Sequence, residues 1–259
     1  MIAAGFVWLT PWPALKLEAP HRDLQIFLLA GQSNMAGRGV IEAQDRVPVP
    51  GVFSLNREMK WVPAVDPLHF ENPKIDGVGL GRSFARVLLY EHPSYEIGLI
   101  PAAVGATNLD QWKRGGALYA DAVRRTREAL KSGTLRGILW HQGEGDALTA
   151  KDASSYIERW SAFIRDLRAD LGAPELPVVV GELCESLYHR PGGRSRFARV
   201  VNEQLALLPF NVAHCAFASS AGLRDKGDSV HFDSPSQREL GRRYAYAFLA
   251  LDPTWAPVH

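Results

Sequence analysis

The stretch Leu24-Gln25-Ile26-Phe27-Leu28-Leu29-Ala30-Gly31-Gln32-Ser33-Asn34-Met35-Ala36-Gly37 decides the fold of this 259-residue chain. Residues 24–30 are almost all apolar, which predicts a buried strand, and small and polar residues follow without a linker. In α/β proteins, a buried strand that ends in this way presents a side chain at the sheet edge where ligands bind. That side chain is Ser33, whose hydroxyl is therefore the first candidate for chemistry.

Apolar runs of strand length recur along the chain and alternate with segments of helical period. We expect strands at 24–30, 96–101, 136–141, 177–183 and 212–218, and helices at 79–91, 117–132, 153–171, 194–208 and 234–251. Continuous apolar strands joined by crossover helices indicate a parallel sheet that is covered on both faces. The sequence therefore predicts an α/β fold, a doubly wound three-layer αβα sandwich around a five-stranded parallel sheet.

The length suits one α/β domain, which we assign to residues 21–259. The proline-rich stretch 38–77 is expected to form an elaborated surface loop over the ligand-binding edge. Residues 1–20 are either an N-terminal arm or the remnant of a secretion signal. The apolar run 2–9 is too short to span a bilayer, and no Lys or Arg precedes it.

The charged residues nearly cancel. The chain has 29 Lys and Arg against 28 Asp and Glu, a formal net charge of +1, and no long basic block. Such a balance does not attract nucleic acid or an anionic membrane, so we expect neither partner and favour a neutral or mildly polar substrate. The two cysteines, Cys184 and Cys215, are too few for a disulfide scaffold and are expected to be buried free thiols.

Ser33 does not lie in a G-x-S-x-G nucleophile elbow, because Met35 stands where the second glycine would be. A serine hydroxyl is a weak nucleophile unless a base takes its proton. The segment Asp228-Ser229-Val230-His231 offers one, since Asp228 can accept the Nδ1 proton of His231 and leave Nε2 facing a serine. The alternative is that all three residues are ordinary turn, cap or loop residues.

Two further segments offer donors for a developing oxyanion. Gln142 follows an apolar strand and can donate from its side-chain amide, while Gly105, just past another strand, can offer its backbone N–H. Glu144 can support the site, or can replace Asp228 as the carboxylate that orients the base. A metal site built from the acidic residues and histidine of this segment matches no familiar ligand spacing, so we expect no metal.

Taken in order, these segments resemble the blocks of the SGNH hydrolase superfamily. The residues that carry the resemblance are Gly31-Gln32-Ser33-Asn34, Gly105, His141-Gln142-Gly143-Glu144, Asp228 and His231. More narrowly, they resemble its carbohydrate acetylesterase branch, carbohydrate esterase family 6 included, with acetylxylan esterases and sialate O-acetylesterase-like proteins. The resemblance runs from about residue 24 to 250. It implies a flavodoxin-like αβα sandwich and a serine esterase without metal or cofactor.

Carried over position by position, the resemblance makes Ser33 the nucleophile, His231 the general base and Asp228 its orienting acid. The oxyanion donors would be the backbone N–H groups of Ser33 and Gly105 together with the Gln142 side chain. The chain departs from the usual pattern at two positions. Ala106 replaces a second glycine, which can displace the Gly105 amide, and Gly145 stands where a serine commonly follows Gly-Glu.

The expected substrate is acetylated carbohydrate, with acetylated xylan or xylo-oligosaccharides first and O-acetylated sialic acid as the alternative. Candidate substrate-binding residues are Arg38, Trp112 and His141, because an arginine can bind a carboxylate and a tryptophan can stack on a sugar ring. A hypothesis of another class is a carbohydrate-binding module that has lost turnover. The compartment and the oligomeric state are left open, although a polysaccharide substrate favours a secreted or periplasmic enzyme.

Overall fold

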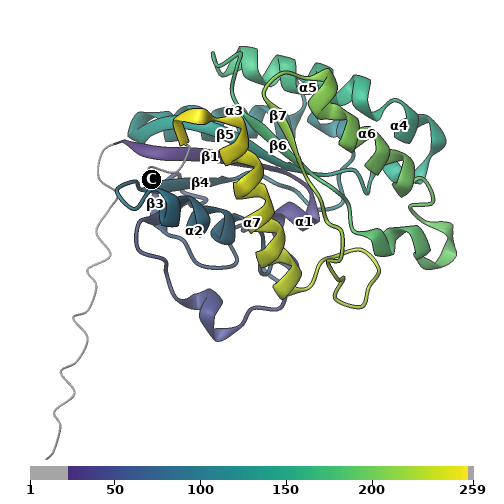
Figure 1. The fold of residues 1–259 in the computed structure, drawn as a ribbon, viewed down its shortest axis with the longest axis horizontal. Coiled ribbons are helices and arrows are strands. Elements are labelled where there is room, and N and C mark those ends of the chain that lie inside the picture. Colours follow the sequence, from purple (N-terminus) through teal and green to yellow (C-terminus); the bar gives the residue numbers. More distant parts are fainter. Residues whose placement is uncertain (1–22, 256–259) are drawn as a thin grey trace, which may run out of the picture.

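The computed structural model describes residues 23–255, and the prediction made for residues 1–20 lies outside them. Seven strands form one sheet in the order β3-β2-β4-β1-β5-β6-β7 (Figure 1). Their bounds are Leu24–Gly31 (β1), Val52–Leu55 (β2), Trp61–Pro63 (β3), Ile97–Pro101 (β4), Gly133–His141 (β5), Val178–Gly181 (β6) and Cys215–Ala218 (β7).

Each neighbouring pair of strands is parallel except β2 and β3, which pair antiparallel at one edge of the sheet. The strands expected from the sequence correspond to β1, β4, β5, β6 and β7. Numbered among themselves, those five follow the spatial order 2-1-3-4-5 of flavodoxin-like folds. The α/β class is therefore confirmed, but the prediction of a five-stranded, purely parallel sheet is wrong.

The two missed strands lie in the stretch 38–77, for which we expected a surface loop. β2 has four residues and β3 has three, too few for an apolar run or an alternating pattern to stand out among the neighbouring glycine and prolines. What holds β2 in the sheet is its pairing with β4, a contact that is remote in the sequence. Local pattern alone could not have revealed that pairing.

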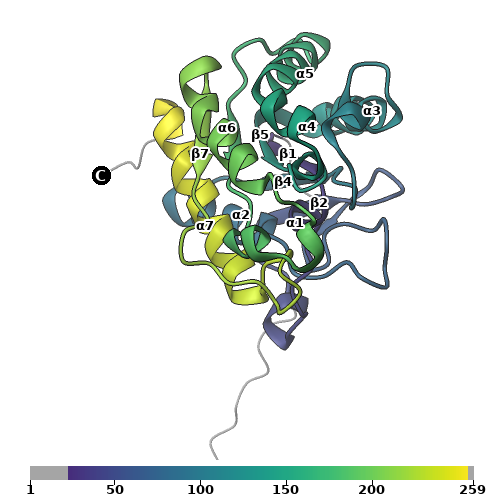
Figure 2. The ribbon, with the colours of Figure 1, turned by 90° about the vertical axis from the view of Figure 1, so that its right-hand side faces the viewer.

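Helices cover both faces of the sheet, as the sequence predicts. α2 and α7 lie on one face, and α3, α5 and α6 lie on the other (Figure 2). The helix bounds are Ser33–Ala36 (α1), Gly81–Glu91 (α2), Ala117–Ala129 (α3), Ala150–Ser154 (α4), Tyr156–Asp170 (α5), Ala198–Asn211 (α6) and Ser234–Leu251 (α7). The single helix expected at 153–171 is divided between α4 and α5.

The central strand β1 is buried on both faces. Ile26 and Leu28 belong to the core that includes α3, α5 and α6, whereas Phe27 and Leu29 belong to the core that includes α2 and α7. The ring of Phe27 packs edge-on against Phe84, with the ring centroids 4.9 Å apart. Each fully buried side chain of this kind contributes roughly 1.5–3 kcal/mol to folding. The apolar run that marks β1 is therefore the centre of the fold.

The topology opens a crevice beyond the carboxyl end of β1. The chain passes from β1 through α2 to β4 on one side, and then through α3 to β5 on the other side of β1. Since α2 and α3 cover opposite faces, the loops after these strands separate at this point, which is where open α/β sheets bind ligands. No helix within residues 23–255 is long and apolar enough to cross a membrane.

Candidate active site

Ser33 is held at the carboxyl end of β1 by a turn that requires glycine. Gly31 has a φ of 129°, and a Cβ at this position would come within 2.2 Å of the carbonyl oxygen of His141. Only a residue without a side chain lets β1 lie against β5 there and turn at once into α1. Ser33 is the first residue of α1 and is 5% exposed, with its hydroxyl reaching the crevice.

The loop after β7 brings His231 to Ser33. His231 Nε2 lies 3.0 Å from Ser33 Oγ, and His231 Nδ1 lies 2.7 Å from Asp228 Oδ2. The other carboxylate oxygen of Asp228 accepts the backbone N–H groups of Val230 and His231, at 2.9 and 2.8 Å. One carboxylate therefore shapes the loop and orients the imidazole, so that Nε2 can take a proton from the Ser33 hydroxyl.

The electrostatics suit a neutral imidazole. Burial lowers the pKa of His231 below its usual value, and the hydrogen bond to Asp228 only partly offsets this. Burial raises the pKa of Asp228, but the hydrogen bonds from His231 outweigh that effect, so the pKa of Asp228 lies below its usual range. At neutral pH the pair is thus an ionised carboxylate beside a neutral histidine, which is the form that accepts a proton.

Backbone donors lie beside the hydroxyl. Gly105 follows β4, and a Cβ at Gly105 would lie 3.8 Å from the Cβ of Ser33. Among the described residues, neither the Ser33 nor the Gly105 backbone N–H donates to a protein acceptor. Ala106, where the sequence departs from the expected glycine, adopts a φ of 59° and still leaves Gly105 in this position. Two amides are therefore available to a developing negative charge.

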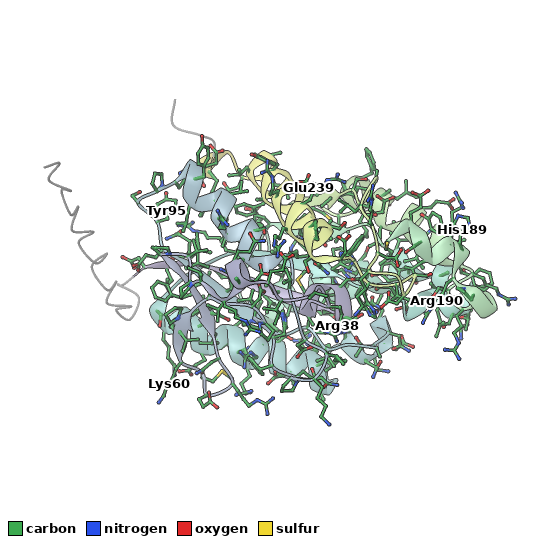
Figure 3. All side chains as sticks on the ribbon, turned by 90° about the horizontal axis from the view of Figure 1, so that it is seen from below. Arg38, Lys60, Tyr95, His189, Arg190 and Glu239 are labelled. Carbon is green, nitrogen blue, oxygen red and sulfur yellow. The ribbon has the colours of Figure 1, made fainter. Side chains whose placement is uncertain are left out.

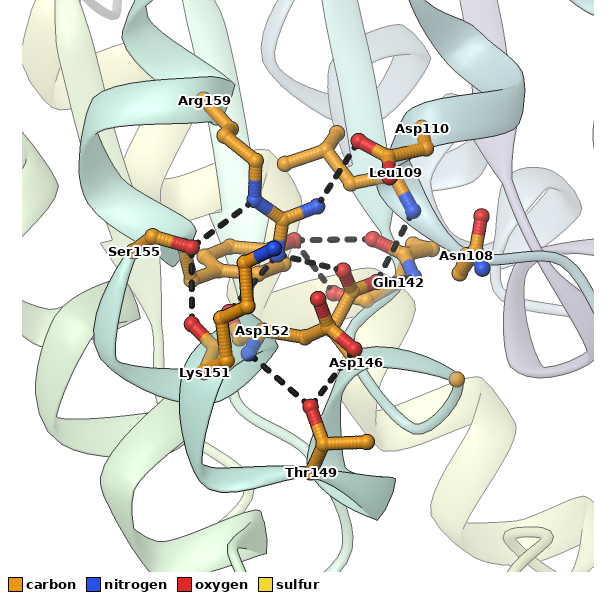
Figure 4. A network of polar contacts seen from close by, with 12 residues as sticks. Asn108, Leu109, Asp110, Gln142, Asp146, Thr149, Lys151, Asp152, Ser155 and Arg159 are labelled. Carbon is orange, nitrogen blue, oxygen red and sulfur yellow. Dashed lines mark hydrogen bonds and ion pairs between the residues drawn. The ribbon is translucent and has the colours of Figure 1, made fainter.

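The structure does not bring the Gln142 side chain to this site, and Figure 4 shows the polar network in which it lies instead. Its Nε2 donates to Asp146 Oδ2 at 2.6 Å and to the Thr107 carbonyl at 3.3 Å, while its Oε1 accepts from the Tyr156 hydroxyl at 3.0 Å. The side chain is fully buried and lines no part of the crevice. The expectation of an oxyanion donor at Gln142 is corrected, because its amide is already committed within the protein.

The Gln142 network instead supports the loop that carries Gly105. Asp146 Oδ2 also accepts the backbone N–H of Leu109 at 2.9 Å, and Asp146 Oδ1 accepts from Arg159 Nη2 at 2.7 Å (Figure 4). Through Thr107 and Leu109, these side chains tie the segment after β4 to the segment after β5. Gln142 thus acts on the site through the backbone rather than by direct contact.

Glu144 lines the crevice but does not touch the imidazole. Its Oε1 accepts from Asn34 Nδ2 at 2.7 Å, and its Oε2 has no hydrogen-bond partner among the described residues. Burial raises the pKa of Glu144 to about 7. Asp228, not Glu144, occupies the Nδ1 side of His231, so Glu144 is not the acid that orients the imidazole in this structure.

Two of the expected substrate-binding residues are buried instead. Trp112 is 0% exposed, packs edge-on against Trp140 with the ring centroids 5.2 Å apart, and donates to Thr107 Oγ1. His141 is also 0% exposed, with its Nδ1 3.0 Å from the Tyr244 hydroxyl. Neither lines the crevice, so the expectation that they bind substrate is corrected. Trp112, although near Gly105 in the sequence, packs in the hydrophobic core beneath the crevice.

The crevice forms a pocket of about 660 Å³. Arg38, the third expected binding residue, does line it, together with Arg190, which the sequence reasoning missed (Figure 3). No local pattern marked Arg190, because it comes from a loop that only the tertiary fold brings to Ser33. Further lining residues missed in the same way are Glu71, Asn72, Ile75 and Leu148, while Gln32 of the Gly31-Gln32-Ser33-Asn34 segment lines the pocket beside Ser33. Within the described residues, no cluster of His, Cys, Asp and Glu could hold a metal ion.

A flavodoxin-like αβα sandwich with a Ser-His-Asp chain of hydrogen bonds at its carboxyl edge defines an SGNH-like hydrolase. Residues 23–250 match the family described as carbohydrate esterase, sialic acid-specific acetylesterase. The match covers most of the chain, so this protein belongs to that family and is a carbohydrate esterase.

Similar proteins agree with this assignment. A probable carbohydrate esterase of Arabidopsis thaliana is 35% identical over 254 residues, 91% of this chain and 94% of the relative. The X-ray structure of a protein from the same locus has a TM-score of 0.79 and 33% identity, covering 88% of this chain and 98% of its own. The crystal structure of NanS has a TM-score of 0.72 at 19% identity, and the match covers 89% of this chain and 98% of NanS. This likeness is one of fold alone.

Proposed function

We propose that this protein is a serine acetylesterase that removes O-acetyl groups from carbohydrate through an acetyl-enzyme on Ser33. The observation that carries the proposal is the position of His231, which lies within hydrogen-bond distance of Ser33 Oγ on one side and Asp228 on the other. The family match over residues 23–250 supports treating residues 21–259 as one esterase domain.

In the first half of the reaction, Ser33 Oγ attacks the acetyl carbonyl carbon while its proton passes to His231 Nε2. The carbonyl oxygen becomes an oxyanion, which the N–H groups of Ser33 and Gly105 stabilise by hydrogen bonding. The bond to the sugar oxygen then breaks, and His231 returns the proton to that oxygen. The sugar leaves with a free hydroxyl, and the acetyl group stays on Ser33.

In the second half, water takes the place of the sugar. His231 Nε2 accepts a proton from the water as the oxygen attacks the acetyl-enzyme, and the same donors stabilise the second oxyanion. Collapse breaks the bond to Ser33 Oγ, which regains its proton from His231. Acetic acid is released, and the enzyme returns to its starting state. The Asp228 carboxylate stabilises the imidazolium that forms in each half.

The first candidate substrate is acetylated xylan or its oligosaccharides, one of the substrate classes of the branch that the sequence resembles. O-acetylated sialic acid is the second, favoured by the family description and by the two arginines that line the pocket, Arg38 and Arg190. A sialic acid carries a carboxylate, which arginine binds well. Acetate release measured side by side from acetylxylan and from O-acetylated sialic acid separates the two, and the substrate with the larger kcat/KM is the one the pocket fits.

A binding module without turnover would keep the pocket and lack the reactive serine. Incubation with a serine-directed fluorophosphonate, followed by peptide mass analysis, tests this directly. Labelling confined to Ser33 at neutral pH supports the esterase. A protein that binds acetylated sugar yet resists the reagent would contradict the proposed esterase mechanism.

A further inference from the structure

The corrected position of Gln142 leaves the candidate oxyanion hole with two backbone donors. Arg38 lies just past Gly37, the C-cap residue of α1, and is only 7% exposed. Its side chain lines the pocket together with Ser33 and Gly105. A buried arginine beside a candidate nucleophile needs a reason, because taking a guanidinium out of water is costly unless its donors are used.

One nitrogen of the Arg38 guanidinium is fixed by the protein. Nη1 donates to Asp76 Oδ1 at 2.8 Å and to the Gly37 carbonyl at 2.7 Å. Asp76 is itself buried, and its other carboxylate oxygen accepts the backbone N–H of Asn72 at 2.8 Å. These contacts leave the planar guanidinium little freedom to turn, so the direction of Nη2 is set as well.

Within the described residues, neither Nη2 nor Nε of Arg38 donates to a protein acceptor, and Nη2 is the one that lies against Gly105. A Cβ placed on Gly105 would lie 2.6 Å from this nitrogen and 3.8 Å from the Cβ of Ser33. The missing side chain of Gly105 therefore leaves room for Nη2, which lies close to Gly105 on the side that also faces the Cβ of Ser33. The charge of Arg38 also acts on His231, whose pKa it lowers.

We propose that Arg38 Nη2 is the third donor of the oxyanion hole, in the role that the sequence pattern assigned to Gln142. The inference rests on the proposed esterase function. A fixed, charged donor stabilises the developing oxyanion more than a neutral amide does, and it costs no reorganisation when the charge appears. Arg38 only donates a hydrogen bond, so no proton is transferred to or from it.

A different role would be to bind a carboxylate of the substrate, and the two roles differ in kinetics. An oxyanion donor acts on every ester, including one that has no other anionic group, and its loss lowers kcat. A carboxylate-binding arginine affects only anionic substrates, and its loss raises KM. 4-Nitrophenyl acetate carries no carboxylate, so it reports on the first role alone.

The test compares wild type with Arg38→Ala and Arg38→Lys on 4-nitrophenyl acetate. We expect kcat to fall by roughly 100-fold or more in Arg38→Ala while KM changes by less than about twofold, since one oxyanion donor is worth about that much. Free guanidinium ion added at millimolar concentration should restore part of kcat in Arg38→Ala but leave wild type unchanged. Arg86→Lys, an exposed position on α2, is the matched control and should behave as wild type.

Removal of Arg38 leaves the Asp76 carboxylate buried without its partner, which can unfold the protein. The double variant Arg38→Met with Asp76→Asn removes both charges and should fold while showing the same loss of kcat. An unchanged kcat on 4-nitrophenyl acetate in a folded Arg38 variant would overturn the inference, as would a loss confined to KM for anionic substrates. Wild type that fails to hydrolyse the ester would contradict the esterase function itself.

Discussion

Asn34 donates a 2.7 Å hydrogen bond from its side-chain Nδ2 to Oε1 of Glu144, and both side chains are buried. The same Nδ2 donates to the Val230 carbonyl at 3.1 Å, and Asn34 Oδ1 accepts the backbone N–H of Phe232 at 3.1 Å. The residue after Ser33 thus holds both neighbours of His231. Glu144 fixes which way the Asn34 amide faces, so that the oxygen meets an N–H and the nitrogen meets a carbonyl.

Substitution of Asn34 by Ala should both destabilise the protein and leave the backbone around His231 less firmly held. The change leaves the Val230 carbonyl and the Phe232 N–H without a partner in a buried place, which costs about 1–3 kcal/mol for each unsatisfied group. We expect a lower free energy of unfolding in urea and a lower kcat/KM. Asn211→Ala, at the exposed end of α6, should change neither. Wild-type kcat/KM in Asn34→Ala would show that His231 is held without this contact.

The pKa of Glu144 predicts how stability depends on pH. Its folded pKa, about 7, lies above the ordinary value of 4.5, so the protonated form favours the fold. That contribution is fully present below pH 4.5 and is lost as pH rises to about 7. Glu144→Gln keeps a neutral acceptor for Asn34 and should remove this loss, up to roughly 3 kcal/mol. The free energy of unfolding of Glu144→Gln minus that of wild type should therefore increase from pH 4 to pH 8.

Urea unfolding at a series of pH values measures that difference. Glu175→Gln, at an exposed position, is the control and should show no such trend. A constant difference between Glu144→Gln and wild type across the range would mean that the carboxyl titrates normally in the fold.

The lowered pKa of His231 predicts at which pH kcat/KM begins to fall on the acid side. Because the pKa of His231 lies below 6.5, the imidazole stays neutral and kcat/KM should hold until the pH is below that value. Asp228 raises the pKa of His231, so Asp228→Asn should move the acid limb further down. It should also lower the plateau by roughly 10⁴-fold, because the imidazole loses its orienting partner. An acid limb that moves upward in Asp228→Asn would contradict the contact between the two residues.

Gln142→Ala distinguishes a residue that supports the site from one that donates to the oxyanion. The substitution removes a hydrogen-bond partner from the buried Asp146 carboxylate and from the Tyr156 hydroxyl. We therefore expect the free energy of unfolding to fall by about 1–3 kcal/mol. The loss of kcat on 4-nitrophenyl acetate should be smaller than in Arg38→Ala. Gln44→Ala, an exposed glutamine, is the matched control. A stable variant with the larger kcat loss would return Gln142 to the oxyanion hole.

The sequence could predict those site residues whose place depends only on where a strand or a short loop ends. Ser33 comes just after the end of the buried strand β1. Asp228 and His231 share one short loop, which lies at the same edge of the sheet as Ser33. The doubly wound αβα arrangement follows from the alternation of strands and crossover helices, whereas the flavodoxin-like order was implied by the family resemblance.

The parts that could not be predicted depend on where a side chain points. Gln142 also follows a buried strand, but its amide turns inward to Asp146, and Trp112 turns into the core against Trp140. A sequence position gives the edge at which a residue lies and not the direction of its side chain. Arg190 and strand β2 were missed because their places are set by contacts remote in the sequence.

The most direct test of the central claim is acetate release by wild type and Ser33→Ala from the same acetylated carbohydrate. The hydroxyl is small and its only side-chain hydrogen bond among the described residues is to His231, so the variant should fold as wild type does. We predict that wild type releases acetate catalytically and that Ser33→Ala loses roughly 10⁴-fold or more of kcat. Equal rates for the two proteins would contradict the acetyl-enzyme on Ser33.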